Sequence, residues 1–358
     1  MKEKIHLFLM LLLTSCAGQA EGYAPRVEYS EEIELTSIMA RTAGFREYCT
    51  DFSDSYDEDM TLWFSSFADH PSIQYLQGLR DRYHVSHDAF STLALHLEKE
   101  GGRYVLRQNT EYLSDRWLSV NKDSLLMMIN RFYADTRFHV FFENHRTFYE
   151  EQCRLFTPSL VDSIDTQWIE RYHGTRGDRF HVVLAFVNGN HNYGPSRASN
   201  NGRENYALAG YVSPRLVQLN GYTLHSLYGD MIVHEFNHSF INPLLRDSTF
   251  RQAMRPLGEE MLRRSYHTMT NMQYGRWDIV VNETLVRAVT LLYKQAHGCS
   301  ASEVERLISE EESHGFRWMT DVVASLEYYG QHRDLYPTLR DYYPKLTDDL
   351  RKALFVGF

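Results

Sequence analysis

Apolar residues recur every three or four positions along most of the chain, which is the spacing of a helix with one buried face. Between residues 31 and 177 this spacing recurs in several segments, for example at Leu125, Ile129 and Phe132. It returns between residues 301 and 358. The pattern therefore predicts helical N- and C-terminal regions with a different central part between them.

The central part, residues 178–300, opens with a change of pattern. Residues 180–187 form an unbroken apolar run rich in β-branched and aromatic side chains, which is typical of a buried strand. After a loop rich in Gly and Asn, residues 206–212 predict a second strand and residues 216–219 a third. Strands combined with helices in this way predict an α+β fold class.

Proline, glycine and serine mark the expected ends of the N-terminal helices. Pro71 and Pro158 predict helix starts, because proline is favoured in the first turn. Ser86 predicts the N-cap of a helix that runs towards Gly101 and Gly102.

The segment MIVHEFNHSFINP, residues 231–243, places polar residues in the middle of an apolar helix. We expect this helix to begin at Thr223 or Ser226. It should end at Asn242, because the residue before a proline is pushed out of helical geometry. The surrounding apolar residues predict that the helix is largely buried.

Two histidines and a glutamate in this helix predict a zinc site. His234 and His238 are four positions apart, so they lie one above the other on one face and both imidazoles can bind the same metal ion. Glu235 lies beside them and is placed to take a proton from a water that zinc activates.

A third ligand must come from farther along the chain, and the sequence favours Glu283. This residue lies in a stretch with the pattern of a buried helix, where a lone carboxylate needs a cation. The alternatives, Glu259 and Glu260, lie in a more polar sequence. Glu283 could instead form a salt bridge with Arg287, four residues later. No H-x-x-G-x-x-H continuation follows His238, which excludes the metzincin arrangement.

The N-terminus has the features of a targeting segment. A basic start and an apolar run at residues 5–13 precede the sequence L-T-S-C, which ends at Cys16. This resembles a bacterial lipoprotein signal with its lipobox. We expect residues 1–15 to be removed as a signal peptide, Cys16 to carry a lipid that anchors the chain to a bacterial membrane outside the cytoplasm, and residues 16–30 to form a tether. The alternative is an ordinary secretory signal peptide. A transmembrane helix is not expected here, because the apolar run has only about half the ~20 residues that such a helix needs.

Composition and charge narrow the classes of partner. With 358 residues, 43% of them hydrophobic, the chain can bury a large core. Its net charge of −10 argues against nucleic acid as a partner, because phosphate binding needs a basic surface. Three cysteines remain besides Cys16, which allows at most one disulfide within the chain. We expect each of them, Cys49, Cys153 and Cys299, to be a free thiol.

The motifs together resemble a known class of enzyme. HEFNH and NETLVRA look like the gluzincin branch of the zincin metallopeptidases, and HEFNHSFINP is similar to the HEFxHSFxNP motif of a bacterial lipoprotein family known as a domain of unknown function. The resemblance implies a zincin-like core for the central part, Zn²⁺, and hydrolysis of a peptide or protein substrate. It implies His234, His238 and Glu283 as ligands and Glu235 as the base. Some gluzincins have an acidic residue where this chain has Arg287, so the groups that support the ligands should differ.

We therefore expect a lipid-anchored zinc metallopeptidase. The alternative is a non-catalytic surface lipoprotein that uses a metal-containing cleft to bind peptide or glycan, and a zinc amidase or another hydrolase is a third reading of the same residues. A further donor should stabilise the oxyanion during hydrolysis. The candidates are Tyr266, His267, Tyr274 and Tyr293.

Overall fold

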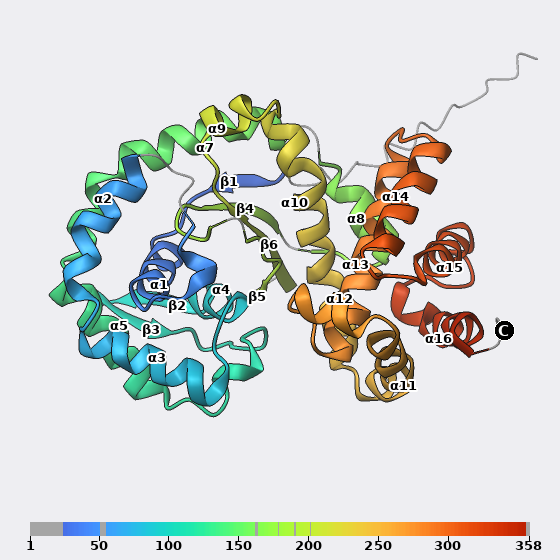
Figure 1. Cartoon of the computed structure of the whole chain (residues 1–358), viewed down its shortest axis with the longest axis horizontal. Coiled ribbons are helices and arrows are strands. Elements are labelled where there is room, and N and C mark those ends of the chain that lie inside the picture. Colours follow the sequence, from blue (N-terminus) through green and yellow to red (C-terminus); the bar gives the residue numbers. More distant parts are fainter. Residues whose placement is uncertain are drawn as a thin grey trace, which may run out of the picture.

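A small four-stranded sheet lies inside the fold, and helices surround it (Figure 1). The computed structural model describes residues 24–50, 55–161, 164–177, 179–189, 191–200 and 202–355. The fold is mixed α+β and mostly helical, which confirms the predicted fold class at that level. The predicted signal peptide and Cys16 lie outside the described residues.

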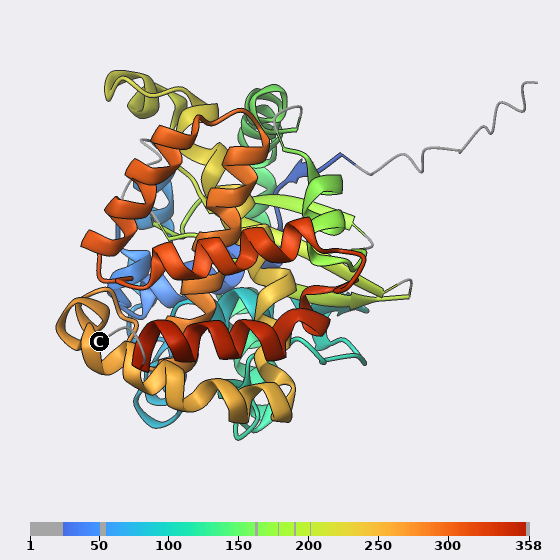
Figure 2. The ribbon, with the colours of Figure 1, turned by 90° about the vertical axis from the view of Figure 1, so that its right-hand side faces the viewer.

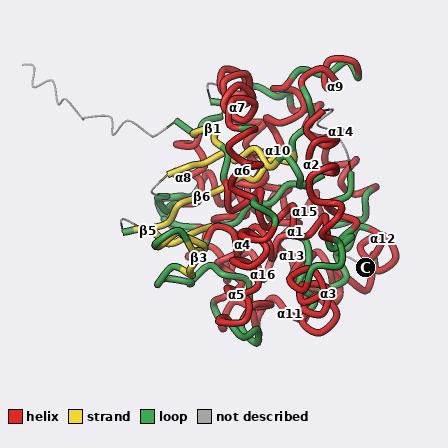
Figure 3. The backbone as a smooth tube through the Cα atoms, turned by 90° about the vertical axis from the view of Figure 1, so that its left-hand side faces the viewer, coloured by secondary structure: helices red, strands yellow, loops and turns green. Residues whose placement is uncertain are grey.

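The sheet has the strand order β1-β4-β6-β5, and its strands gather on one side of the chain trace (Figure 3). β4 is parallel to both β1 and β6, whereas β5 is antiparallel to β6. β1 and β5 are therefore the edge strands. The strands are β1 (Arg26–Glu28), β4 (Arg179–Ala185), β5 (Ser196–Ser199) and β6 (Gly202–Gly210).

Both faces of β4 are covered, which explains its unbroken apolar sequence. Val182 and Leu184 belong to the buried cluster that includes Phe236 of helix α10 (Leu224–Ile241). Val183 and Ala185 belong to a second cluster, which includes residues of α1 (Glu31–Thr42) and α4 (Asp88–Leu95). The sheet is thus enclosed between α10 on one side and α1 and α4 on the other.

The N-terminal region is helical except for one hairpin. Its other helices are α2 (Ser55–Phe64), α3 (Pro71–Tyr83), α5 (Lys122–Asp135), α6 (Phe138–Asn144), α7 (Arg146–Leu160) and α8 (Thr166–His173), with 3₁₀ turns η1 (Arg46–Tyr48), η2 (Ser65–Phe67) and η3 (Asp115–Trp117). The hairpin consists of β2 (Leu97–Glu100) and β3 (Arg103–Leu106).

From residue 214 onward every element in the described residues is helical, and Figure 2 shows the last helices lying across the face of the molecule opposite the N-terminal helices. The C-terminal helices bury another large hydrophobic cluster, to which α13 contributes more residues than any other helix. These elements are α9 (Pro214–Leu219), η4 (Asn242–Arg246), α11 (Ser248–Arg264), α12 (Tyr266–Asn271), α13 (Trp277–Ala296), α14 (Ala301–Ser313), α15 (Met319–Gln331) and α16 (Leu339–Phe355).

Three predicted element boundaries are wrong. The helix assigned to Ser86 is α4, which ends at Leu95 and is followed by the hairpin, because Gly101 and Gly102 have positive φ values of 56° and 79° and form its two-residue turn. Pro158 does not start a helix but lies inside α7, where it removes one hydrogen bond near the C-terminal end. Residues 216–219 are helical in α9, because Ser213 caps a helix that begins at a proline.

Two short strands lie in segments that were predicted to have none. β1 falls within the predicted tether, so the ordered fold begins before residue 31. β5 falls within the predicted Gly- and Asn-rich loop. Both are edge strands of three or four residues, too short for a hydrophobic pattern to be recognised.

Cys49, Cys153 and Cys299 are free thiols, as expected. No helix in the described residues is long and apolar enough to cross a bilayer.

One buried carboxyl group joins α1, α2 and the end of β4. Glu34 is fully buried and accepts hydrogen bonds from the Tyr56 hydroxyl (2.9 Å) and from the Phe186 N–H (2.8 Å). Burial raises its pKa to about 8, although both hydrogen bonds act in the opposite direction. Glu34 is therefore mostly protonated at neutral pH in the folded protein.

We expect Glu34 to make the fold less stable as the pH rises. Its folded pKa lies above its unfolded value, so its contribution to stability is complete below about pH 4.5 and is lost as the pH rises towards about 8, at roughly 1.4 kcal/mol per pH unit. Glu34→Gln, which resembles the protonated group, should remove this part of the pH dependence. Urea unfolding of both proteins between pH 5 and 8 measures it. Parallel stability profiles for the two proteins would contradict the assignment.

Candidate metal centre

Helix α10 carries the two histidines, and local signals set its start. Thr223 is the N-cap, and its side chain and that of Ser226 satisfy each other's backbone N–H groups in a capping box. The helix ends at Ile241, with Asn242 as its C-cap before Pro243. Its predicted bounds, Thr223 or Ser226 to Asn242, are confirmed to within a residue, but the predicted reason for the end is wrong, because Asn242 keeps helical angles (φ −55°, ψ −40°) and the chain continues into η4.

Helix α13 packs against α10, and buried polar groups fix the two helices relative to each other. Asn237, fully buried on α10, donates from Nδ2 to the Thr290 hydroxyl of α13 at 3.4 Å. The amide oxygen of Asn237 accepts a 2.8 Å hydrogen bond from His173 Nε2 at the end of α8. Burial lowers the pKa of His173 to about 3, so this histidine is neutral.

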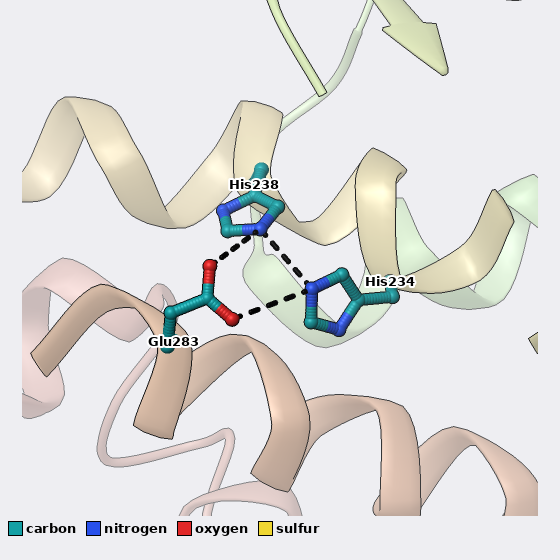
Figure 4. Close-up of side chains that lie close together, drawn as sticks. All are labelled: His234, His238 and Glu283. Atoms are coloured by element: carbon teal, nitrogen blue, oxygen red, sulfur yellow. Dashed lines mark hydrogen bonds and ion pairs between the residues drawn. The ribbon is translucent and has the colours of Figure 1, made fainter. Parts of the chain in front are cut away.

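His234, His238 and Glu283 converge between α10 and α13 (Figure 4). The two Nε2 atoms of the histidines are 3.2 Å apart. Glu283 Oε1 lies 3.4 Å from His238 Nε2, and Glu283 Oε2 lies 3.7 Å from His234 Nε2. The side chains come from both helices and point towards one another across their interface.

These spacings and the donor atoms fit a zinc ion. Two ligands about 2.0–2.1 Å from one ion at a tetrahedral angle lie about 3.3–3.4 Å apart, close to the separations of the ring nitrogens and carboxylate oxygens. In addition, Glu283 Oε2 is buried and receives no hydrogen bond from any described residue. The Arg287 Nε lies 3.4 Å from this oxygen without forming a hydrogen bond to it, so the Arg287 charge compensates the oxygen only in part, and a cation bound between the ligands would complete the compensation.

The tautomer of His238 also suits a metal ligand. Its Nδ1 donates a 3.1 Å hydrogen bond to the side-chain oxygen of Asn242, one turn later on the chain. When the ring is neutral, this leaves the Nε2 lone pair directed towards His234 and Glu283. Asn242 therefore orients the ring as well as ending the helix.

Arg287 supports Glu283, so the salt bridge considered as an alternative forms alongside the His–Glu cluster. Its Nε lies 3.4 Å from Glu283 Oε2. Its Nη1 donates to both oxygens of Glu311 on α14, at 3.0 and 2.9 Å. Glu311, in the acidic run 310–312, thus contributes a carboxylate to the surroundings of the site. The Arg287 guanidinium thus supports the Glu283 carboxylate, the candidate ligand, and is itself held by the Glu311 carboxylate.

The pKa values of His234, His238 and Glu283 are shifted in different ways, which distinguishes the protonation states of the three groups. Burial lowers the pKa of His234 to about 3, and His238 adds to the effect. Burial acts in the same direction on His238, but the hydrogen bond and charge of Glu283 outweigh it and raise the pKa of His238 to about 9, while the pKa of Glu283 is lowered. His238 therefore holds a proton next to the ionised Glu283, and a bound metal ion would displace this proton.

Glu235 lies beside the cluster and is also buried, with 6% of its surface exposed. Burial raises its pKa to about 7; the charge of His238 lowers the pKa and that of Glu283 raises it. In the part of the chain that the structure describes, no group donates a hydrogen bond to this carboxylate. A carboxyl group with a pKa near neutrality can both accept and release a proton.

A close approach of the chain forms one wall beside Glu235. A Cβ atom on Gly194 would lie 2.0 Å from the Glu235 carbonyl oxygen and 2.8 Å from the His238 Cβ. Only glycine allows the segment before β5 to lie directly on α10 here. The same segment is joined to β6 by two backbone hydrogen bonds between Tyr193 and Leu208. Helix α10 is thus held against the sheet at the level of the candidate site.

The alternative third ligands are not at the site. Glu259 pairs with Arg255 at 2.7 Å, and Glu260 pairs with Arg263 and Arg264 at the same distance, on the outer face of α11. The structure thus brings Glu283 alone of these three to the two histidines.

Of the four candidate oxyanion donors, Tyr274 lies nearest to the cluster. Its hydroxyl is 3.5 Å from Arg287 Nη2, and burial followed by the charge of Glu283 raises its pKa to about 12. Tyr266 and His267 are exposed on α12. The Tyr293 hydroxyl accepts the Asp165 N–H at 2.8 Å, so it faces α8.

Four supporting residues were not identified from the sequence. Asn242 could have been found from its i+4 spacing to His238, which lets it accept from the ring. Asn237 lies inside the motif but gives no sign of its partner. His173 and Glu311 are brought in by the tertiary fold and have no sequence signal.

Comparison with protein families identifies one match. The model described as "Domain of unknown function (DUF4932)" matches residues 24–348. The chain belongs to this family. Comparisons with curated proteins and with solved structures give no match. Both helices of the candidate metal centre lie within the region that the family model covers.

We expect Glu283 to be needed for zinc binding. Glu283→Gln removes the anionic ligand and should lower zinc affinity by more than about 100-fold, beyond the loss typical of an outer partner. Chelator competition measures the affinity, and metal analysis of the purified protein gives the stoichiometry. Glu260→Gln is the matched control and should bind zinc like the wild type. Unchanged affinity in Glu283→Gln, or a loss in Glu260→Gln, would exclude this ligand set.

We expect Asn242 to act through the orientation of His238. Asn242→Ala removes the acceptor for Nδ1 and should weaken zinc binding by about 10–100-fold. Asn242→Asp keeps an acceptor and should retain the affinity. The same chelator competition compares them, and equal affinities for the alanine variant and the wild type would show that this hydrogen bond is not needed.

Proposed function

We propose that this protein is a zinc-dependent peptidase, anchored by a lipid on Cys16 to a bacterial membrane and acting outside the cytoplasm. The observation that carries the proposal is the convergence of His234, His238 and Glu283 around one point, with the buried carboxyl of Glu235 beside them. A structural metal site would need the three ligands but not Glu235.

The surrounding fold supports the proposal. The helix with HEFNH packs on a small sheet, and the helix with NETLVRA packs against it, as the resemblance to zincin metallopeptidases implies. We include a zincin-like core for the central part of the chain in this proposal. The lipobox that ends at Cys16 supports the location.

The chemistry assigns a role to each group. His234, His238 and Glu283 would hold zinc, which when bound polarises the scissile carbonyl and makes water a better nucleophile. Glu235 accepts the proton of the attacking water and delivers it to the leaving amine, which matches a pKa of about 7. Arg287 holds the Glu283 carboxylate in place. The Tyr274 hydroxyl is the nearest candidate to donate a hydrogen bond to the oxygen that becomes negative.

We expect Glu235→Gln to separate catalysis from metal binding. The amide cannot accept the proton, so kcat should fall by about 10²–10⁴-fold while zinc affinity stays near that of the wild type. Purified protein loaded with zinc is assayed on unfolded proteins and peptide libraries, and metal content is measured on the same samples.

Two results would contradict the peptidase proposal. Cleavage at wild-type rates by Glu235→Gln would exclude this carboxyl as the base. Zinc binding by the wild type without cleavage of any peptide or protein would favour the non-catalytic lipoprotein that binds peptide or glycan at a metal-containing cleft.

A further inference from the structure

Residues 219–227, called the α9–α10 connection below, run from the end of α9 into the first turn of α10. They expose apolar side chains at one end of the molecule. Leu219, Tyr222 and Leu227 are 71%, 55% and 37% exposed and fall within nine residues. The other exposed large apolar residues are scattered along the chain. In Figures 1 and 2 this connection projects beyond its neighbours at the top of the molecule. Such a concentration of apolar surface at a projecting tip marks an interaction site.

The charge of this tip differs from that of the whole protein. No acidic residue occurs between Glu204 and Asp230, although the chain has 47 Asp and Glu and a net charge of −10. Arg215 in the same stretch is exposed. A neutral to weakly basic tip with leucines and a tyrosine suits the boundary between lipid headgroups and acyl chains.

The backbone at the tip is already hydrogen-bonded within itself. The Tyr222 N–H donates to the Val217 carbonyl at 3.0 Å, and the Asn220 side chain donates to the Leu216 carbonyl at 2.8 Å. The capping box described above satisfies the start of α10. These bonds lower the cost of moving the tip out of water, because fewer polar groups lose their partners.

The start of the folded chain limits where the membrane can be. Ala24 is the first described residue, eight positions after Cys16, and an extended chain of that length spans at most about 27 Å. β1, which begins two residues later, lies in the upper part of Figure 1, as the α9–α10 connection does, whereas Figures 2 and 3 show the two on opposite sides of the molecule. A flat bilayer along the upper end of the molecule would therefore face both the start of β1 and the apolar tip.

We infer that the α9–α10 connection docks into the surface of the bilayer that holds the lipid anchor, with Leu219 and Tyr222 entering the headgroup region. The inference rests on the lipid anchoring proposed above, not on the peptidase activity. α10 then acts as a spacer. His234 lies ten residues after Leu224, the first residue of α10, or about 15 Å along the helix, so docking fixes the distance of the metal centre from the membrane.

A fluorescence experiment on the lipidated protein tests this docking. Leu219→Cys is labelled with an environment-sensitive fluorophore, after Cys49→Ser and Cys299→Ser remove the other accessible thiols. The matched control is Leu118→Cys, since Leu118 is also a leucine and is 72% exposed. In vesicles of phosphatidylethanolamine and phosphatidylglycerol, lipids brominated in the acyl chains should quench the label at position 219 but not at 118.

The outcomes separate docking from anchoring. Protein that sediments with the vesicles, but whose label at 219 is quenched by aqueous iodide as strongly as that at 118, overturns docking and leaves the anchor intact. Protection of the label at 219 from iodide without quenching by brominated lipid means that a second copy covers the tip, and this also overturns docking. Protein that fails to sediment with the vesicles overturns the anchor and the docking together.

A substitution in the non-lipidated chain gives a second measurement. With Cys16→Ser, vesicle binding depends on the tip alone, and Leu219→Asp should reduce it about tenfold or more, since burying one leucine side chain is worth about that factor. Leu118→Asp should leave it unchanged. Equal binding by the two aspartate variants would overturn the inference even if both fold normally.

Discussion

A carboxylate buried between two helices is the constraint on which the candidate centre depends. Glu283 lies with Glu235 and Glu311 in a small volume that contains one guanidinium, that of Arg287. If all these groups are ionised, negative charge exceeds positive charge by two, and the proton on His238 offsets only one of the two charges, because His234 is neutral. A divalent cation bound at the point where ring nitrogens and carboxylate oxygens meet would supply the missing charge.

The rest of the fold holds the two helices at the separation that this cluster needs. The sheet supports α10 from one side, and Gly194 lets the chain lie against the helix without a side chain between them. α13 is held from the other side, where the Trp318 indole donates to the Thr284 hydroxyl at 2.9 Å. Polar contacts to Asn237 prevent α10 from rotating. Since a metal site tolerates displacements of only a few tenths of an ångström, this rigidity matters more than the strength of any one contact.

Features that follow local rules could be predicted from the sequence. The start of α10 follows from Thr223, and β4 follows from its unbroken apolar run. The placement of His234 and His238 on one face follows from helical geometry alone. Glu283 could be predicted because a carboxylate in an apolar helix needs a partner, and the structure provides the histidines and Arg287 together.

Features that depend on distant segments could not be predicted. His87 forms the N-cap position of α4 with a positive φ of 48°, where its backbone is bonded to Glu47 and Tyr48, and no local signal indicates this. The pairing of His173 with Asn237 joins residues 64 positions apart. Residues 216–219 contain three apolar residues and one glutamine, a pattern that fits a strand or a helix equally well, and the Ser-Pro pair before them decides for the helix.

The parallel pairing of β1 with β4 has a consequence for the order of folding. Arg26 pairs with His181, more than 150 residues later, and β4 also needs β6 on its other side. A chain that emerges N-terminus first must therefore keep its first strand unpaired until about residue 210 is available. The intervening helices can form from nearby contacts during that time. The sheet that supports α10 is thus completed late in synthesis, only shortly before that helix itself emerges.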